Sequence, residues 1–74
     1  MKTNNEDKFL KIIKKNLSIK EKITLQAKVS SFKKWDSLNN VRILIDLNKA
    51  FKTEVKFSSI NGVKDLEDLF NYFT

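Results

Sequence analysis

The apolar residues that follow Asp36 constrain the fold of this chain more than any other feature. From Ser37 to about Phe51 or Lys52 they recur at helical spacing, and they place one group of side chains on a single face: Val41, Ile43, Leu44, Leu47 and Phe51. Asp36 is a favourable N-cap residue, so the helix is expected to begin at Ser37. The sequence therefore predicts a long amphipathic helix that buries this face and carries Ser37 in its first turn.

Two more amphipathic segments predict helices near the ends of the chain. Between residue 6 and about residue 16, Phe9, Ile12 and Ile13 share one face, and lysines occupy the opposite side. The last helix is expected from about Lys64 to Phe73. Its inner face should hold the apolar residues Val63, Leu66, Leu69, Phe70 and Phe73.

The segments between these helices lack sustained periodicity. Residues 17–35 hold scattered apolar side chains, so we expect a loop that wraps across a helical core and is pinned at several points, with one helical turn near residues 20–23. Residues 52–57 alternate polar and apolar side chains and predict an extended connection anchored by Val55 and Phe57. Ser58-Ser59 should then cap a very short helix around Ile60, which Asn61-Gly62 ends.

The chain has no proline and one glycine, which favours helices joined by connections over β-hairpins. The predicted fold class is all-α: a small four-helix bundle with three main helices, a short third helix and a long first loop. The 74 residues are expected to form one domain, 1–74, which can bury only about 60% of the unfolded surface. Residues 1–5 are expected to fray, with Thr3, Asn4 or Asn5 available to cap the first helix.

The sequence contains neither histidine nor cysteine, so it lacks the usual general base, the thiolate nucleophile and most zinc ligands. Ser37 has no histidine to activate it, and a lysine base would need burial that a lysine-covered domain of this size does not favour. We therefore expect no enzyme activity and no metal site. We also expect a soluble, cytoplasmic monomer, because no 18-residue apolar run or secretory signal is present.

The positive charge of the chain is confined to its first half. Residues 1–35 hold ten lysines against three acidic residues, a formal charge of +7, whereas residues 36–74 hold five basic and six acidic residues, a charge of −1. One alternative function is therefore a small basic module that binds nucleic acid or a regulatory partner. Only one arginine is available to read base edges, and the aromatic residues mostly occupy core positions, so we expect no nucleic-acid binding.

Trp35-Asp36-Ser37-Leu38 and the apolar helix that follows resemble the modification site and second helix of acyl carrier proteins, including stand-alone carriers in which a tryptophan precedes Asp-Ser-Leu. The resemblance extends over the order and approximate length of the helices, the long first loop, and Phe51 with Glu54 and Val55 after the second helix. Asp-Ser-Leu alone is a weak signal. Together with the chain length and the lack of catalytic side chains it is a strong one.

The resemblance implies that Ser37 carries 4′-phosphopantetheine, derived from coenzyme A, through a phosphodiester. A phosphopantetheinyl transferase would attach this arm, and its thiol would carry acyl or aminoacyl thioesters between separate loading and transferring enzymes. Asp36 would cap the helix and assist recognition by the transferase. The resemblance also assigns a set of apolar residues to the interior or to an acyl-chain lining: Val41, Leu44, Leu47, Val55, Ile60 and Leu66.

The resemblance further implies that the partner enzymes contact the flank formed by Leu38, Arg42, Ile45 and Lys49, where helical spacing leaves two large apolar residues outside the core face. Typical members of the family are strongly acidic on this helix. Here Arg42 and Lys49 replace that acidity, and a basic partner surface would meet like charge. We therefore expect a specialised biosynthetic pathway with dedicated enzymes.

Overall fold

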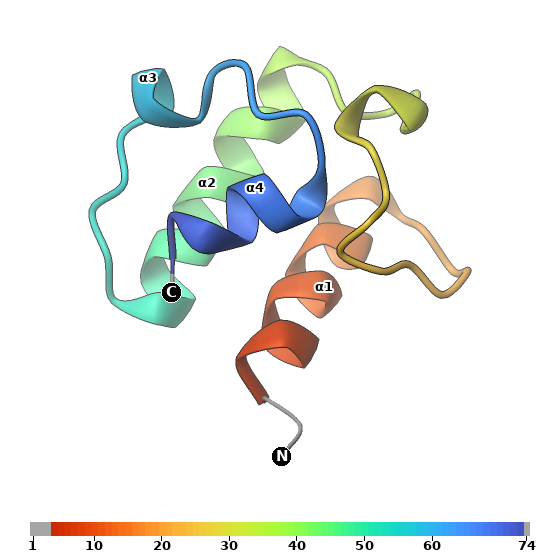
Figure 1. Cartoon of the computed structure of the whole chain (residues 1–74), viewed down its shortest axis with the longest axis horizontal. Helices are drawn as coiled ribbons and strands as arrows, with labels where there is room; N and C mark the ends of the chain where they lie inside the picture. The colour runs from red at the N-terminus through yellow and green to blue at the C-terminus, as the bar shows by residue number, and fades with distance from the viewer. Residues whose placement is uncertain (1–3, 74) are drawn as a thin grey trace.

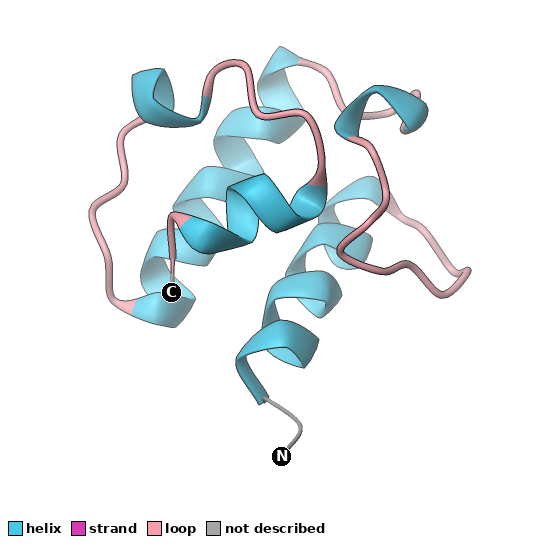
Figure 2. Ribbon diagram, viewed as in Figure 1, coloured by secondary structure: helices cyan, strands magenta, loops and turns pink. Residues whose placement is uncertain are grey.

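The described residues form four α-helices and one 3₁₀ turn, and their arrangement is drawn in Figure 1 and Figure 2. They are α1 (Asn4–Leu17), η1 (Val29–Ser31), α2 (Ser37–Phe51), α3 (Phe57–Ile60) and α4 (Leu66–Asn71). The structure is a computed structural model that describes residues 4–73. Within these residues there is no β-strand, and one isolated antiparallel bridge joins Lys28 to Asp65. The predicted all-α class, with three main helices, a short third helix and a long first loop, is confirmed.

The first helix, α1, buries one face along its whole length. Phe9, Ile13 and Leu17 follow one another at four-residue intervals and are all fully buried. The helix begins at Asn4, two residues before its expected start. The expected fraying of residues 4 and 5 stays a prediction. Acidic residues in the first turn and lysines in the last turn match the helix dipole and support this longer helix. The remaining residues predicted to fray, 1–3 with Thr3 as a cap, lie outside the described residues, as does residue 74.

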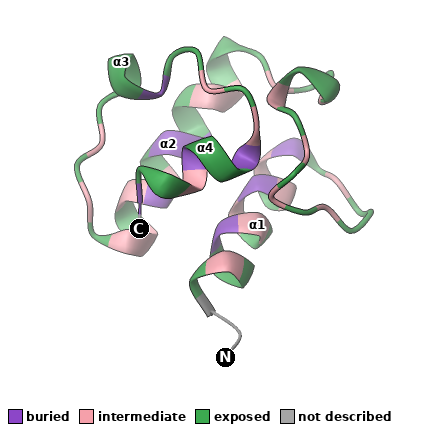
Figure 3. Ribbon diagram, in the orientation of Figure 1, coloured by how far each residue is buried: buried purple, intermediate pink, exposed green. Residues whose placement is uncertain are grey.

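The core lies where α1, α2 and α4 meet, and the buried stretches of these helices face one another (Figure 3). Its buried members are all apolar: Phe9, Ile13, Leu17, Ile43, Leu44, Leu47, Ile60, Leu66, Leu69 and Phe73. Two aromatic pairs join the C-terminal segment to the other helices. The ring centroids of Phe9 and Phe70 are 5.0 Å apart, and those of Phe51 and Phe73 are 6.0 Å apart. The predicted inner face of the last helix is therefore confirmed.

Polar contacts fix α2 against α1 near both ends of α1. The Lys8 Nζ donates to the carbonyl oxygen of Ala50 at 3.1 Å and lies 5.0 Å from the ring centroid of Phe51. The Lys8 ammonium therefore lies beside the last turn of α2, where a cation interacts favourably with the negative end of the helix dipole. Farther along α1, the Asn16 Nδ2 donates to the Asp46 Oδ2 at 2.9 Å. These contacts set the direction of the helix that Ser37 begins.

The long loop between α1 and α2 wraps across the core, as predicted. Its apolar side chains are partly buried against the core cluster: Ile19, Ile23, Leu25, Ala27, Val29, Phe32 and Trp35. The helical turn predicted near residues 20–23 is absent, and η1 forms instead. From residue 22 to residue 30 exposed and partly buried residues alternate, through a turn at residues 25–26 and into η1. In the turn, the Ala27 N–H donates to the Thr24 carbonyl at 3.1 Å. The partly buried side chains therefore reach the core from several points along the loop.

The same loop supplies hydrogen-bond partners for the start of α4. The backbone N–H of Leu66 donates to the Ala27 carbonyl at 3.0 Å, and the backbone N–H of Glu67 donates to the Leu25 carbonyl at 2.9 Å. The first N–H groups of a helix have no partner within the helix. The loop therefore stabilises α4, a helix of six residues that would be marginal in isolation.

The start of α4 differs from the prediction, which placed it at about Lys64. The Lys64 carbonyl instead accepts a hydrogen bond from the Val29 N–H at 2.9 Å, so this part of the backbone is extended. Asp65 is the N-cap residue, and its carboxylate accepts from the Asp68 N–H at 2.9 Å. The helix therefore begins at Leu66, because residues 64 and 65 pair with the loop.

The third helix, α3, also begins at a different residue. Its N-cap is Lys56 and its first residue is Phe57, so Ser58-Ser59 lie within the helix and do not cap it. Ile60 is buried, as expected, and the helix ends before Gly62, whose φ of 102° is readily adopted by glycine. The prediction that Phe57 anchors the connection is wrong. Its side chain is 44% exposed, because Ile60 is the α3 residue that reaches the core.

Asn48 organises the connection between α2 and α3. Its Oδ1 accepts from the Thr53 Oγ1 at 2.7 Å and from the Val55 N–H at 2.9 Å, and its Nδ2 donates to the Val55 carbonyl at 3.0 Å. The left-handed Lys52, with φ of 55°, turns the chain back toward Asn48. Val55 packs against the core, so its predicted role as an anchor is confirmed.

Replacing Asn48 by alanine should lower the free energy of unfolding by about 2 kcal/mol, because three side-chain hydrogen bonds worth about 0.5–1.5 kcal/mol each are lost. Urea denaturation followed by circular dichroism measures the change. The control is Lys49→Ala at the next, exposed position, where a change within about 0.5 kcal/mol is expected. Equal effects of the two substitutions would contradict the role given to Asn48.

Candidate functional site

The segment from Trp35 to Leu38 begins α2 in the way the sequence predicts. Asp36 has extended backbone angles, φ −104° and ψ −174°, and its Oδ1 accepts a hydrogen bond from the Asn39 N–H at 2.9 Å. Its carbonyl oxygen accepts from the Asn40 N–H at 2.9 Å. The N-cap prediction is therefore confirmed, and Ser37 is the first residue of α2.

Two asparagines hold the approach to Ser37 in place. The Trp35 Nε1 donates to the Asn40 Oδ1 at 3.0 Å, and the Asn39 Nδ2 donates to the Lys34 carbonyl at 2.7 Å. Neither contact is among the features predicted from the sequence. The sequence did hold a signal for them, because Asn39 and Asn40 are adjacent in the first turn of α2. Asparagine is unfavourable inside helices and often forms hydrogen bonds with nearby polar groups.

Ser37 is exposed to solvent at the positive end of a 15-residue helix. The N–H groups of the next residues, Asn39 and Asn40, are bonded to Asp36. The backbone N–H groups of Ser37 and Leu38 have no hydrogen-bond partner within the described part of the chain. An exposed hydroxyl therefore stands beside two N–H donors that are available to an oxyanion.

An open depression of about 440 Å³ lies next to Ser37. Its walls come from four parts of the fold, namely the start of α2, η1, α3 and the turn after α3: Val29, Trp35, Asp36, Ser37, Asn40, Phe57, Ile60, Asn61, Gly62 and Val63. The lining is mixed on both sides: the α2 side offers the Trp35 ring beside Asp36 and Asn40, and the α3 side offers apolar side chains beside the amide of Asn61. It can hold an elongated group that has both apolar and hydrogen-bonding parts.

The described side chains around Ser37 supply little chemistry of their own. Asp36 is the only carboxylate in the lining, and one of its oxygens already accepts the capping hydrogen bond. Among residues 4–73, no group of three His, Cys, Asp or Glu side chains lies close enough together to hold a metal ion.

Most of the predicted interior residues lie in the core. Leu44, Leu47, Ile60 and Leu66 are buried in the same cluster, and Val55 packs against that cluster. They are packed in the centre of the domain, and Ile60 also lines the depression beside Ser37. The structure thus joins the site to the core through Ile60.

Val41 is the exception, because its side chain is 40% exposed and the prediction that it faces the core is wrong. The core face of α2 is set by Ile43, Leu44 and Leu47. Val41 precedes Ile43 by two residues, which is about 200° around an α-helix, so the two side chains cannot share a narrow face. Val41 instead lies on the solvent side.

The four residues of the predicted docking flank are all on the solvent side of α2. Leu38 is 61% exposed and Ile45 is 49% exposed, and Arg42 and Lys49 are exposed as well. Large aliphatic side chains are thus left in water next to two cations. The predicted exposure of this flank is confirmed, whereas its docking role stays a prediction.

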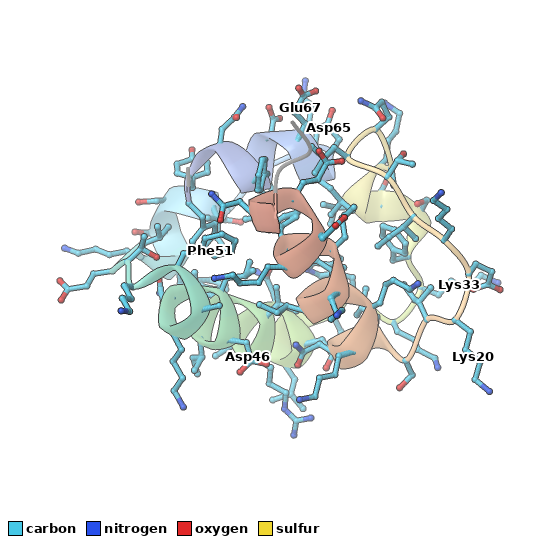
Figure 4. All side chains as sticks on the ribbon, turned by 90° about the horizontal axis from the view of Figure 1, so that it is seen from below. Lys20, Lys33, Asp46, Phe51, Asp65 and Glu67 are labelled. Carbon is cyan, nitrogen blue, oxygen red and sulfur yellow. The ribbon has the colours of Figure 1, made fainter. Side chains whose placement is uncertain are left out.

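The lysines of the first half are spread over α1 and the long loop. Every described lysine between residues 4 and 35 is exposed except Lys14, which is partly buried. Lys20 and Lys33 extend outward from the loop (Figure 4). Lys8 differs from the others, because it is bonded to the end of α2. The basic charge therefore covers two elements, and Lys11, Lys14 and Lys15 line one open depression, together with Asp7 and Ile19.

Comparisons of the chain with protein-family models, with curated proteins and with solved structures gave no match. None of the helices formed by residues 4–73 has the length and apolarity needed to cross a lipid bilayer.

Proposed function

We propose that this chain is a carrier protein that holds acyl or aminoacyl groups as thioesters on a 4′-phosphopantetheine arm attached to Ser37. The observation that carries the proposal is the position of Ser37. Its hydroxyl is exposed at the first residue of α2, directly after a capping aspartate and beside an open depression. The resemblance of Trp35-Asp36-Ser37-Leu38 to the modification site of acyl carrier proteins supports the same proposal.

The start of α2 fits a phosphodiester on Ser37. The N–H groups of Ser37 and Leu38 are available to its oxygens, and the positive end of the helix dipole favours the negative charge. Asp36 remains committed to the Asn39 N–H, so its carboxylate does not occupy these donors. Trp35 and Asn40, held together by their hydrogen bond, form the adjacent wall along which the arm would lie.

The attachment step needs a second enzyme. The Ser37 Oγ attacks the phosphorus of coenzyme A that bears the pantetheine, a new P–O bond forms, and the diphosphate P–O bond breaks to release adenosine 3′,5′-bisphosphate. A base of a phosphopantetheinyl transferase would take the hydroxyl proton, and magnesium held mainly by the transferase would supply charge stabilisation for the phosphate that leaves with adenosine. This chain contributes a positioned hydroxyl and two N–H donors.

The bound arm would supply a thiol, which the chain itself lacks because it contains no cysteine. The domain would then present the thioester to loading and transferring enzymes. Sheltering of a carried chain would require the packed residues Leu44, Leu47 and Leu66 to separate, since they fill the core. A short or polar cargo therefore suits the domain better than a long fatty chain.

The alternative is nucleic-acid binding by the basic first half. Two aromatic residues of this half lie near exposed lysines, but the rings of Phe32 and Trp35 are partly buried against the core, with centroids 6.0 Å apart. Rings in this position are not free to stack on successive bases. The site at Ser37 therefore favours the carrier function.

Titration of thiols tests the proposal. The full chain is incubated with coenzyme A, magnesium and a broad-specificity phosphopantetheinyl transferase, freed of coenzyme A, and reacted with a chromogenic disulfide. One thiol per chain is expected, over a background of zero because no cysteine is present. Absence of a thiol after treatment with several transferases of different specificity would overturn the proposal.

A further inference from the structure

The solvent face of α2 carries three large aliphatic side chains in a row. Leu38, Val41 and Ile45 are 61%, 40% and 49% exposed and follow one another at i, i+3 and i+7, so they lie along one side of the helix. Arg42 and Lys49 are exposed on the same side, two turns apart. We call these five residues the α2 ridge. Val41 belongs to it because the structure places that residue outside the core.

The charge of the α2 ridge lies along one edge. At about 100° per residue, Arg42 and Lys49 fall between the aliphatic row and Asp46, whose carboxylate is bonded to α1. Val41 lies on the opposite edge, toward Asn48, which is bonded to the segment before α3. The ridge therefore has an apolar edge that borders the α3 side and a cationic edge that borders the α1 side.

We propose that the α2 ridge docks into an apolar groove with carboxylates along one rim, on the enzymes that act at Ser37. The inference rests on the proposed function and adds the chemistry of the partner surface. Leu38 is the residue next to Ser37, and Arg42 follows Leu38 by about one turn. An enzyme that encloses the Ser37 hydroxyl therefore has to cover the first two turns of the ridge.

Charge complementarity selects acidic groups on that enzyme. Arg42 and Lys49 lie on α2 with the carboxylate of Asp46 turned toward Asn16, so the ridge itself presents cations. A basic partner surface would be repelled, which lowers the association rate, whereas carboxylates on one rim would attract the ridge and fix its direction. The aliphatic row supplies apolar contacts at the spacing used when a helix binds in a groove.

Other occupants fit the ridge less well. A second copy related by a twofold axis would bring the same cationic edges toward each other. Nucleic acid would find only two cations to bind its phosphates, and the three aliphatic side chains would then face charged groups. A bilayer would receive only the outer side of a helix whose opposite face is fixed in the core through Ile43, Leu44 and Leu47. A protein groove satisfies both the apolar row and the one-sided charge.

Kinetics of Ser37 modification test the inference. Two phosphopantetheinyl transferases with opposite charge around their active-site entrances are assayed at saturating coenzyme A and at low and high ionic strength. The substrates are the wild type, the double variant Arg42→Glu/Lys49→Glu, and the control Lys11→Glu/Lys15→Glu, which changes the net charge equally on exposed positions of α1.

For the wild type, kcat/KM should be about tenfold higher with the acidic transferase than with the basic one at low salt, and the preference should shrink at high salt. The α2 double variant should prefer the basic transferase, because its KM rises with the acidic enzyme and falls with the basic one. The α1 control should keep the wild-type ratio of the two kcat/KM values within about twofold. Ile45→Ala should raise KM with both transferases. Modification without any charge preference, or equal effects of the two double variants, would overturn the docking role of the α2 ridge. Neither result would contradict the proposed function, because Ser37 would still be modified.

Two further outcomes are decisive. No modification of Ser37 by either transferase would mean that the proposed function has failed. Co-sedimentation of the wild type with vesicles of phosphatidylcholine and phosphatidylserine, abolished by Arg42→Glu/Lys49→Glu and retained by Lys11→Glu/Lys15→Glu, would assign the α2 ridge to a membrane surface and overturn the inference.

Discussion

Replacing Ser37 by alanine should abolish the attachment of phosphopantetheine completely and leave the fold unchanged. The Ser37 hydroxyl is the acceptor in the proposed reaction, so no thiol should appear after treatment with coenzyme A and a transferase. Ser37 is exposed at the first position of α2, where alanine is tolerated, and the free energy of unfolding should stay within about 0.5 kcal/mol of the wild type. Thiol titration and urea denaturation measure the two quantities on the same preparation.

Ser58→Ala is the matched control for this substitution. Ser58 is also an exposed serine in a helix, but it lies in α3. Its replacement should leave the thiol at one per chain. A thiol that persists in the Ser37→Ala protein would show that another hydroxyl is the acceptor.

Replacing Leu47 by alanine should lower the free energy of unfolding by about 2–5 kcal/mol, because the side chain is fully buried and its removal leaves a cavity. Small domains are stable by only about 5–15 kcal/mol, so the variant should lose a large share of its stability. The midpoint of urea denaturation, with the slope held equal, measures the loss.

Leu38→Ala provides the comparison, because it removes the same atoms from the same helix. Leu38 is 61% exposed, so its replacement should change the free energy of unfolding by no more than about 0.5 kcal/mol. If Leu38→Ala costs as much as Leu47→Ala, the assignment of the two faces of α2 is wrong. The pair therefore separates residues that hold the core from residues that remain available to a partner.

The parts of the fold that local chemistry determines were predictable from the sequence. The helical spacing of Leu44, Leu47 and Phe51, and the cap at Asp36, gave both ends of α2. The faces of α1 and α4 followed from the same kind of pattern. Each of these features depends on residues within a few positions of one another, because N-capping and the helical periodicity of apolar side chains are both local effects.

Features that depend on distant contacts were not predictable. The start of α4 is set by pairing with a loop that lies about forty residues earlier, and the course of that loop is set by the core it covers. Val41 lies at the border between the two faces of α2, so the spacing of apolar residues does not decide whether it is buried. The packing of Ile43 and Leu44 in the core leaves it on the solvent side. Asn48 and Lys8 look like ordinary polar residues until their partners are brought near.

The candidate site also has features that the sequence predicts and features that it does not. Ser37 and its cap followed from the sequence, and so did the exposure of Leu38 and Ile45. The depression beside Ser37 did not, because its walls come from η1, α3 and the turn at Gly62, which are far apart in the chain. The contact between Trp35 and Asn40 likewise depends on the turn that brings the ring back over α2.

The most direct test of the carrier proposal is mass spectrometry of the intact wild-type chain after incubation with coenzyme A, magnesium and several phosphopantetheinyl transferases, followed by fragmentation of the modified peptide. The proposal predicts a mass increase equal to one phosphopantetheine, located on Ser37. An unchanged mass with every transferase, in a folded protein that binds DNA or RNA with a steep dependence on salt, would contradict it and favour the basic half as the functional surface.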